Sequence, residues 1–237
     1  MDYKNQIFNM DCLAGLSLLP DNSVDMVLTD LPYGTTSGAW DTLLPLPDLW
    51  RQLNRVTKRN GAMVFTAAQP FTTTLIASNP KQFRYCWYWI KNQVTGFPFS
   101  HFQPLRCVEE IAVFYRAAPT YNPQGLVALE HPRRQAGKHF TSESVYRKDG
   151  LERTTWQRYT NYPRQILTFP CQREGLRPTQ KPVALFEYLV RTYTEPGQLV
   201  LDCCIGSGTT KVACRNAGRD YVGFEIDHKF YEIAEAR

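Results

Sequence analysis

Short apolar runs without a polar face recur along this chain. Residues 24–29, 61–65, 199–201 and 221–224 each form such a run, with Asp25 as an acidic outlier near the start of the first. A run of this length is typical of a strand that is buried on both faces, as in a parallel sheet covered by helices. The pattern therefore predicts an α/β fold around a mostly parallel sheet.

The segments around these runs predict the other elements. A helix is expected to begin at Pro182, because proline suits a first helical turn and an apolar stripe follows at helical spacing. That stripe consists of Val183, Phe186, Leu189, Val190 and Tyr193, for which core packing is the expected role. The remaining predicted elements are strands at residues 7–8, 83–90 and 108–115, and helices at residues 13–19, 49–59, 72–78, 209–217 (ending at Gly218) and 227–237.

The run at residues 199–201 leads into a glycine turn. Asp202 closes the run, and Gly206-Ser207-Gly208 follows. A strand, a glycine turn and a helix in this order let bare backbone approach a ligand at the helix N-terminus. Glu225, at the end of the next run, is placed to accept hydrogen bonds from ribose hydroxyls. A missing third glycine argues against a nicotinamide cofactor and leaves adenosine-containing ligands open; a tight turn beside a solvated acid is the simpler alternative.

A second acid follows the run at residues 24–29. This acid is Asp30, and Leu31-Pro32-Tyr33-Gly34 comes directly after it. In open parallel sheets, ligands bind outside the carboxyl ends of the strands. We therefore expect Asp30 and Tyr33 to share one sheet edge with Asp202 and Glu225.

Composition fits one α/β domain of 237 residues with an insertion, since 43% of the residues are hydrophobic. There is no apolar run of membrane-spanning length and no charged-then-apolar leader, so we expect a cytoplasmic protein with no membrane partner. The seven cysteines include no Cys-x-x-Cys pair. Neither a zinc site nor a disulfide framework is indicated, and mostly buried, reduced thiols are expected.

Most of the net charge of +5 lies in residues 119–164, where regular periodicity fades. The eight basic residues there are Arg133, Arg134, Lys138, Arg147, Lys148, Arg153, Arg158 and Arg164, against four acids, which leaves +4. Tyr121, Phe140, Tyr146, Trp156, Tyr159 and Tyr162 are interleaved with them. This mixture suits phosphate contacts with base stacking or base-edge contacts, while a solvated insertion with a small core of its own is the alternative.

The linker at residues 96–104 is too apolar for a loop without a role. It contains Phe97, Phe99, His101 and Phe102. A lone histidine is more often a packing or hydrogen-bonding residue than a catalyst, so His101 is not assigned a catalytic role.

The tetrad Asp30-Leu31-Pro32-Tyr33, together with the downstream Asp-x-x-x-Gly-x-Gly turn, resembles the S-adenosylmethionine-dependent DNA amino-methyltransferases. The tetrad precedes the cofactor turn, as in the permuted beta group, adenine-N6 type. Residues 7–34, IFNMDCLAGLSLLPDNSVDMVLTDLPYG, and residues 177–210 are similar to that group. The resemblance implies a Rossmann-like methyltransferase fold: a mostly parallel twisted sheet with helices on both faces and circularly permuted motif order. It further implies a catalytic domain at residues 1–118 and 165–237, and a basic target-recognition insertion at residues 119–164.

The resemblance also implies roles for single residues. The catalytic residues would be Asp30, Leu31 through its carbonyl, Pro32 and Tyr33. S-adenosylmethionine would be bound by Asp11, Cys12, Asp30, Lys181, Asp202, Cys204, Gly206, Ser207, Gly208, Thr209, Glu225 and Ile226. Thr179, Gln180 and Pro182 belong to the block beside the methionine end. The sequence departs from the usual pattern at Leu31, where proline is common, and at Cys203-Cys204, where Pro-Phe is common, so Ile205 is a candidate for the missing pocket wall. Taken alone, Asp11 is equally an N-cap and Asp202 a turn former.

Aspartate at the first tetrad position favours adenine-N6 methylation of double-stranded DNA, with cytosine-N4 methylation as the alternative. Methylation of RNA or of protein glutamine is a further alternative, as is a non-catalytic DNA-binding subunit that retains the fold. The resemblance also implies two possible partners, a second copy of the chain in a homodimer and a cognate restriction enzyme.

Overall fold

The computed structural model describes residues 3–34, 41–135, 155–171 and 180–237. The chain forms two compact units, one of Met1–Asn122 with Gln165–Arg237 and the other of Pro123–Arg164. Several residues named above lie outside the described ranges: Lys138, Phe140, Tyr146, Arg147, Lys148, Arg153 and Thr179. None of the described helices is both long and apolar enough to cross a membrane.

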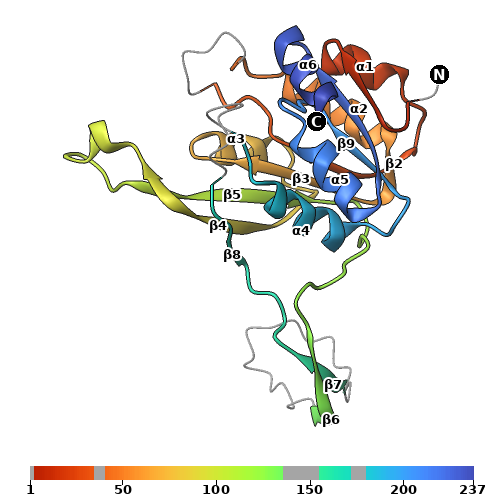
Figure 1. Cartoon of the computed structure of the whole chain (residues 1–237), viewed down its shortest axis with the longest axis vertical. Coiled ribbons are helices and arrows are strands. Elements are labelled where there is room, and N and C mark those ends of the chain that lie inside the picture. Colours follow the sequence, from red (N-terminus) through yellow and green to blue (C-terminus); the bar gives the residue numbers. More distant parts are fainter. Residues whose placement is uncertain (1–2, 35–40, 136–154, 172–179) are drawn as a thin grey trace. The chain divides into compact units, whose positions relative to one another are not determined.

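The first unit is built on an eight-stranded sheet with the order β1-β10-β9-β2-β3-β5-β4-β8 (Figure 1). Its strands are β1 (Gln6–Asn9), β2 (Val24–Thr29), β3 (Thr57–Ala67), β4 (Phe83–Thr95), β5 (Arg106–Phe114), β8 (Ile166–Thr168), β9 (Leu199–Asp202) and β10 (Asp220–Glu225). The strands from β1 to β3 in this order are all parallel, whereas β5 pairs antiparallel with both β3 and β4. This confirms the predicted α/β fold with a mostly parallel sheet.

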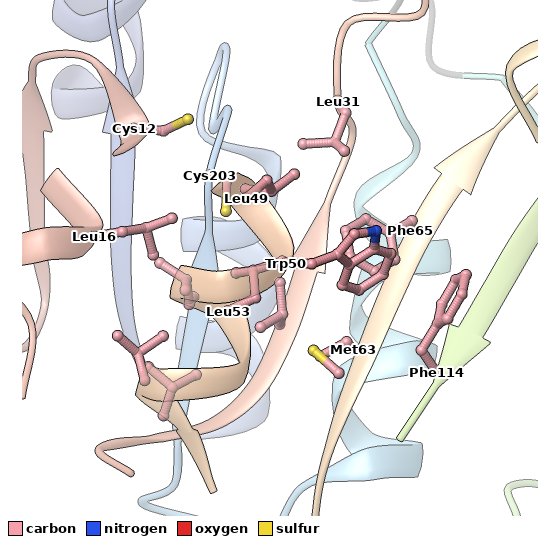
Figure 2. Close-up of a cluster of buried hydrophobic side chains, with 14 of the residues drawn as sticks. Cys12, Leu16, Leu31, Leu49, Trp50, Leu53, Met63, Phe65, Phe114 and Cys203 are labelled. Atoms are coloured by element: carbon pink, nitrogen blue, oxygen red, sulfur yellow. The ribbon is translucent and has the colours of Figure 1, made fainter. Parts of the chain in front are cut away.

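Helices cover both faces of the sheet. On one face lie α1 (Cys12–Leu18), α2 (Leu46–Val56) and α3 (Phe71–Ser78), and on the other lie α4 (Val183–Tyr193), α5 (Thr209–Ala217) and α6 (His228–Ala236). Strand residues alternate between the two cores, as strand geometry requires: Leu199 and Leu201 face the first and Val200 the second. Figure 2 shows part of the first core, where Trp50 of α2 packs against Phe65 of β3.

The boundaries of β2 and α5 are those predicted, whereas the other predicted elements differ by one residue or more at one end at least, and α2, β3 and β4 differ most. The helix predicted at residues 49–59 is α2, which begins at Leu46 after Pro45 and ends at Val56. Thr57 is already extended and pairs with Val24, so residues 57–59 belong to β3. Strand β4 continues to Thr95, beyond the predicted end at residue 90, because Thr95 pairs with Arg106 across a hairpin.

The second unit contains two strands that the sequence pattern did not predict. These are β6 (Val127–Gln135) and β7 (Thr155–Thr160), which pair antiparallel. The unit begins at Pro123, whereas the insertion was expected from residue 119. Asn122 stays with the first unit because its backbone N–H donates to the Thr192 carbonyl at 2.7 Å and its amide donates to the Thr194 carbonyl.

All seven cysteines are free thiols, as expected. Cys12, Cys86, Cys203 and Cys214 are buried, and the other three are partly buried.

Candidate active site

Four acidic residues lie in a row along one edge of the sheet. The strands β1, β10, β9 and β2 are parallel neighbours in that order. Their carboxyl ends therefore place Asp11, Glu225, Asp202 and Asp30 one after another on the same edge. This confirms the shared edge that the sequence predicted. The edge contains residues from both ends of the chain, because β1 pairs with β10.

The turn from β9 into α5 depends on glycine. Gly206 and Gly208 have positive φ angles of 56° and 82°. A Cβ on Gly208 would lie 3.1 Å from the Ala234 Cα, and a Cβ on Gly223 would lie 2.4 Å from the Ile205 Cδ1. Ile205 is buried against β10, and its N–H donates to the Phe224 carbonyl at 3.0 Å. The glycines thus keep the turn flat against the sheet edge.

Three of the four acids hold the local backbone. Glu225 accepts hydrogen bonds from the N–H of Gly206 at 2.9 Å and from the N–H of Asp227 at 3.0 Å. Asp11 caps α1 by accepting from the N–H of Ala14 at 3.0 Å. The cap that the sequence left open as an alternative for Asp11 is therefore present in the fold.

Asp202 is a turn former and a buried charge. It accepts from the Cys204 N–H at 3.1 Å and from the Thr210 hydroxyl. Burial raises its pKa to about 6, although the hydrogen bonds from Thr210, Thr29 and Cys204 act in the opposite direction. Its negative charge is thus poorly compensated at neutral pH, which favours a cationic group beside it.

Asp30 accepts three hydrogen bonds from side chains of the protein. The Tyr33 hydroxyl and the Thr66 hydroxyl donate to its Oδ1 at 2.7 and 2.5 Å, and the Lys181 ammonium donates to its Oδ2 at 2.7 Å. A carboxylate has about four acceptor sites, so capacity for about one more donor remains. The side chain is 26% exposed, which leaves that capacity accessible.

Lys181 links Asp30 to a second acid, Glu109, which is also partly buried. Its ammonium lies 3.6 Å from Glu109 Oε2, and Glu109 Oε1 accepts from Lys91 at 2.9 Å. Burial works against the charge on Lys181, but Asp30 and Glu109 outweigh it and raise its pKa. Lys181 is therefore a cation with only 7% of its side chain exposed. The ion chain Asp30-Lys181-Glu109-Lys91 joins β2, the segment before α4, β5 and β4.

The remainder of the tetrad is held by packing. The Tyr33 ring stacks on Phe71, with 5.2 Å between centroids, and the Gly34 N–H donates to Asp41 at 2.8 Å. Burial and the nearby Asp30 raise the pKa of Tyr33 well above its usual value, so its hydroxyl stays protonated and able to donate. The Leu31 side chain is buried in the core, which leaves its backbone as the part available to a ligand.

One pocket brings together residues from the two sequence blocks. It is lined by Asp30, Gln180, Lys181, Phe186, Asp202, Cys204, Ile205, Gly206, Ser207 and Thr209. Gln180 Nε2 is buried there and has no hydrogen-bond partner among the described residues. The other predicted cofactor residues do not line this pocket: Asp11, Cys12, Gly208, Glu225 and Ile226.

Those other residues are distributed around the same edge. Cys12 is buried, and its thiol hydrogen-bonds to Cys204, which together with burial raises the pKa of Cys204. Ile226 directly follows β10 and is 69% exposed, so it offers an apolar surface at the edge. Cys203 is buried in the core and donates its N–H to the Thr29 hydroxyl at 3.2 Å.

Three residues that contact Asp30, Tyr33 or Lys181 were not predicted from the sequence. Thr66 lies one position beyond the run at residues 61–65, so its place at the carboxyl end of β3 was a detectable signal. Phe71 stacks on Tyr33, and Glu109 reaches Lys181 through the antiparallel strand β5. No local pattern marks either of the last two residues.

The comparisons with known proteins point to one family and one fold. The sequence profile of a family described as "DNA methylase", the N6/N4 methylases, matches residues 24–236. The Type II methyltransferase M.BglII from Bacillus subtilis is 27% identical over 253 residues, covering 97% of this chain and 68% of its own length. A solved M1.HpyAVI-SAM complex has a TM-score of 0.65 at 22% identity and covers 98% of each chain. The cytosine-N4-specific PvuII DNA methyltransferase has a TM-score of 0.69 at 17% identity, covering 98% of this chain and 85% of that one.

Proposed function

Because this chain belongs to the N6/N4 family of DNA methylases, we propose that it transfers a methyl group from S-adenosylmethionine to N6 of an adenine in double-stranded DNA. The observation that carries the proposal is the position of Asp30. Its carboxylate lines the same pocket as the glycine turn and retains capacity for about one more donor. An amine that binds there meets an acceptor beside the cofactor pocket.

An exocyclic amine of a base is a poor nucleophile because its lone pair is delocalised into the ring. Acceptors on its two hydrogens favour a tetrahedral nitrogen and stabilise the positive charge that develops in the transition state. Asp30 would accept one hydrogen and the Leu31 carbonyl, held by Pro32, the other. The hydroxyls of Tyr33 and Thr66 fix the carboxylate for this task.

The target base must leave the duplex to reach Asp30, since its amine is inaccessible within the stack. Tyr33 offers a ring beside the acid on which the base would stack. One face of that ring is already covered by Phe71. The Lys181 ammonium also lies over the ring, 5.6 Å from its centroid, so the base would stack on the part of the ring that these two residues leave uncovered.

The lining of the pocket suits the amino-acid end of S-adenosylmethionine, which supplies an electrophilic methyl group on a positively charged sulfur. The buried Gln180 amide is a donor that matches a carboxylate, and the buried Asp202 matches an ammonium group. Glu225 would bind the ribose hydroxyls and Asp11 the adenine amino group, with Cys12 and Ile226 beside it. The remaining contacts would come from Lys181, Cys204, Gly206, Ser207, Gly208 and Thr209.

The aspartate of the tetrad favours adenine. Cytosine N4 is the second candidate, because the similar PvuII structure is described as cytosine-N4-specific. Both bases present an exocyclic amine, so the chemistry at Asp30 would be the same. The distinction rests on the base that the pocket admits.

The unit Pro123–Arg164 would recognise the target sequence. Its described basic residues Arg133, Arg134, Arg158 and Arg164 are exposed, and so are Trp156 and Tyr159. Exposed arginines contact phosphates and exposed aromatic rings stack on bases. M.BglII is named a Type II methyltransferase, and this supports a restriction endonuclease of the same sequence specificity as a partner of this chain.

The test is to incubate the protein with methyl-labelled S-adenosylmethionine and unmethylated bacterial genomic DNA, then digest the DNA to nucleosides. Labelled N6-methyldeoxyadenosine is the expected product. Labelled N4-methyldeoxycytidine would keep the reaction and replace the base. Absence of labelled DNA, with S-adenosylmethionine binding detected by calorimetry, would overturn the proposal.

A further inference from the structure

The hairpin between β4 and β5 exposes a cluster of phenylalanines. Phe97, Phe99 and Phe102 are 76%, 56% and 87% exposed, and Val94 at its base is 58% exposed. Single exposed apolar residues are ordinary, but several within one short turn mark an interaction surface. We name residues 94–106 the aromatic hairpin.

The aromatic hairpin extends from the sheet edge that carries Asp30. Strands β3 and β4 both pair antiparallel with β5, so β4 runs parallel to β3 and to β2. The carboxyl end of β4, where the aromatic hairpin begins, is thus on the same side as the carboxyl end of β2. Figure 1 shows this hairpin, in yellow, projecting beyond the sheet.

Ion pairs tie the base of the aromatic hairpin to Asp30. Lys91 of β4 and Glu109 of β5 pair at 2.9 Å, directly below the hairpin. Glu109 also faces Lys181 at 3.6 Å, and Lys181 holds Asp30 at 2.7 Å. The hairpin is therefore fixed relative to the candidate catalytic acid.

The tip itself has a defined shape. Gly96 has a φ of 90°, and the N–H groups of Phe99 and Phe102 donate to the carbonyls of Gly96 and Phe99 at 2.9 Å each. The two successive turns hold the phenylalanines before any partner arrives. A preformed tip loses less conformational entropy on binding than a flexible one.

The charge of the aromatic hairpin suits a polyanion. Residues 92–108 contain no Asp or Glu, and they include Arg106 and His101. Apolar side chains on a support without negative charge match the interior of a base stack flanked by phosphates. A surface for a protein partner has no comparable reason to exclude acids.

We propose that Phe97, Phe99 and Phe102 enter the DNA duplex beside the target base and stack in the gap that the base leaves when it rotates toward Asp30. The proposal rests on the proposed function in naming the target base. Apolar wedges inserted between base steps unstack them, and aromatic rings stack on any exposed base. The aromatic hairpin thereby stabilises the opened duplex.

The first test measures insertion without methylation. A relaxed plasmid is treated with topoisomerase in the presence of wild-type protein or of the double variant Phe97→Ala/Phe102→Ala. The wild type should change the linking number, because insertion unwinds the duplex, and the double variant should not. Leu18→Ala is the matched control, since Leu18 is 53% exposed but lies on α1 at the other end of the sheet; it should behave as wild type.

The second test measures methylation of one oligonucleotide duplex in two forms. The duplex contains the target sequence, which is identified by sequencing the DNA that the protein has methylated. The double variant should be slower than wild type by about tenfold or more on the fully paired duplex. It should be within about threefold of wild type when the target base faces an abasic position, where opening costs little. The single variant Phe102→Trp should keep the wild-type rate on the paired duplex, because tryptophan also stacks on bases.

Unchanged cofactor affinity and thermal melting will show that the double variant is folded. Equal losses on both duplexes, or linking-number changes equal to those of wild type, would overturn the inference. So would a shift from dimer to monomer in sedimentation, because the aromatic hairpin would then serve a second copy of this chain. A wild type that unwinds the plasmid but methylates no DNA would overturn the proposed function and leave the insertion supported.

Discussion

Asp30 uses three of its acceptor sites inside the protein, and under the proposed function this limits how it would bind a substrate. Tyr33, Thr66 and Lys181 orient the carboxylate, so its remaining capacity has a fixed direction. A fixed acceptor stabilises a transition state more than a mobile one does, because no reorganisation is needed during the reaction.

Replacing Asp30 by asparagine should separate catalysis from cofactor binding. The amide keeps the size of the side chain but removes its negative charge, so methyl transfer should fall by about 100-fold or more. The dissociation constant of S-adenosylmethionine should stay within about threefold, because the other pocket residues are untouched. Single-turnover kinetics and calorimetry measure the two quantities. Methylation at the wild-type rate would contradict the assigned role.

The ion chain makes a prediction about coupling. Lys181→Met should lower the free energy of unfolding by about 3 kcal/mol, because Asp30 and Glu109 lose their shared buried cation. Glu109→Gln should partly relieve this loss, so the double variant should be less destabilised than the sum of the single variants. Urea unfolding of the four proteins gives the coupling energy. Strictly additive effects would mean that the chain does not act as a unit.

Asp202 predicts a pH dependence of stability. Its pKa is raised from 3.8 to about 6 by burial, so the folded state holds a proton that the unfolded state releases. The stabilisation is complete below about pH 4 and is lost as the pH rises through about 6, which amounts to about 3 kcal/mol. Asp202→Asn lacks this loss, so its stability relative to wild type should increase across that range. A constant difference between the two proteins in urea unfolding would refute the assignment.

At the scale of elements, α5 depends on the glycines at its two ends. Gly208 precedes it with a φ of 82°, and a Cβ there would meet the Ala234 Cα. Gly218 follows it with a φ of 70°, and a Cβ there would have no neighbour within 4 Å among the described residues. Both glycines adopt the left-handed region, but only Gly208 has a close neighbour.

This difference allows a matched pair of variants. Gly218→Ala should cost about 1 kcal/mol of stability, which is the backbone term alone. Gly208→Ala adds a clash with α6 and should cost about 3 kcal/mol, with weaker binding of S-adenosylmethionine because the turn must move. Thermal or urea unfolding and calorimetry give both quantities. Equal costs would show that the contact with Ala234 has no effect on stability.

The elements that sequence predicted well are those whose ends or faces carry a local signal. The boundaries of β2 and α5 follow from an apolar run before Asp30 and from glycines around a helix. Strands β6 and β7 have no such signal, because their two-stranded ribbon lacks a buried apolar face and reads as polar. The same reasoning explains the site: Asp30 and Asp202 follow buried runs, whereas Glu109 reaches Lys181 only through long-range antiparallel pairing.

At the scale of the whole molecule, the two units have separable tasks under the proposed function. The first unit contains the candidate active site with its pocket, and the second contains exposed arginines and aromatic rings. Phosphate contacts make DNA affinity depend on salt in proportion to the number of charges engaged.

Replacing residues 123–164 by a flexible glycine-serine linker tests this division. The first unit should keep its fold and bind S-adenosylmethionine with an affinity within about twofold, because its pocket residues all lie outside the deleted range. DNA affinity should fall by about tenfold or more, with a shallower dependence on salt concentration. Calorimetry and fluorescence anisotropy at several salt concentrations measure these effects. Unaltered DNA binding would exclude the second unit from target recognition.

The position of β10 has a consequence for the time at which the enzyme first becomes active in the cell. This strand lies between β1 and β9, yet residues 220–225 are synthesised after every other described strand. During translation, the sheet therefore lacks the strand between β1 and β9 until the last residues have been synthesised. Glu225, whose carboxylate accepts from the Gly206 N–H of the glycine turn, arrives with the strand that closes the gap. Under the proposed function, we therefore expect that a chain whose translation stops before β10 neither binds S-adenosylmethionine nor methylates DNA.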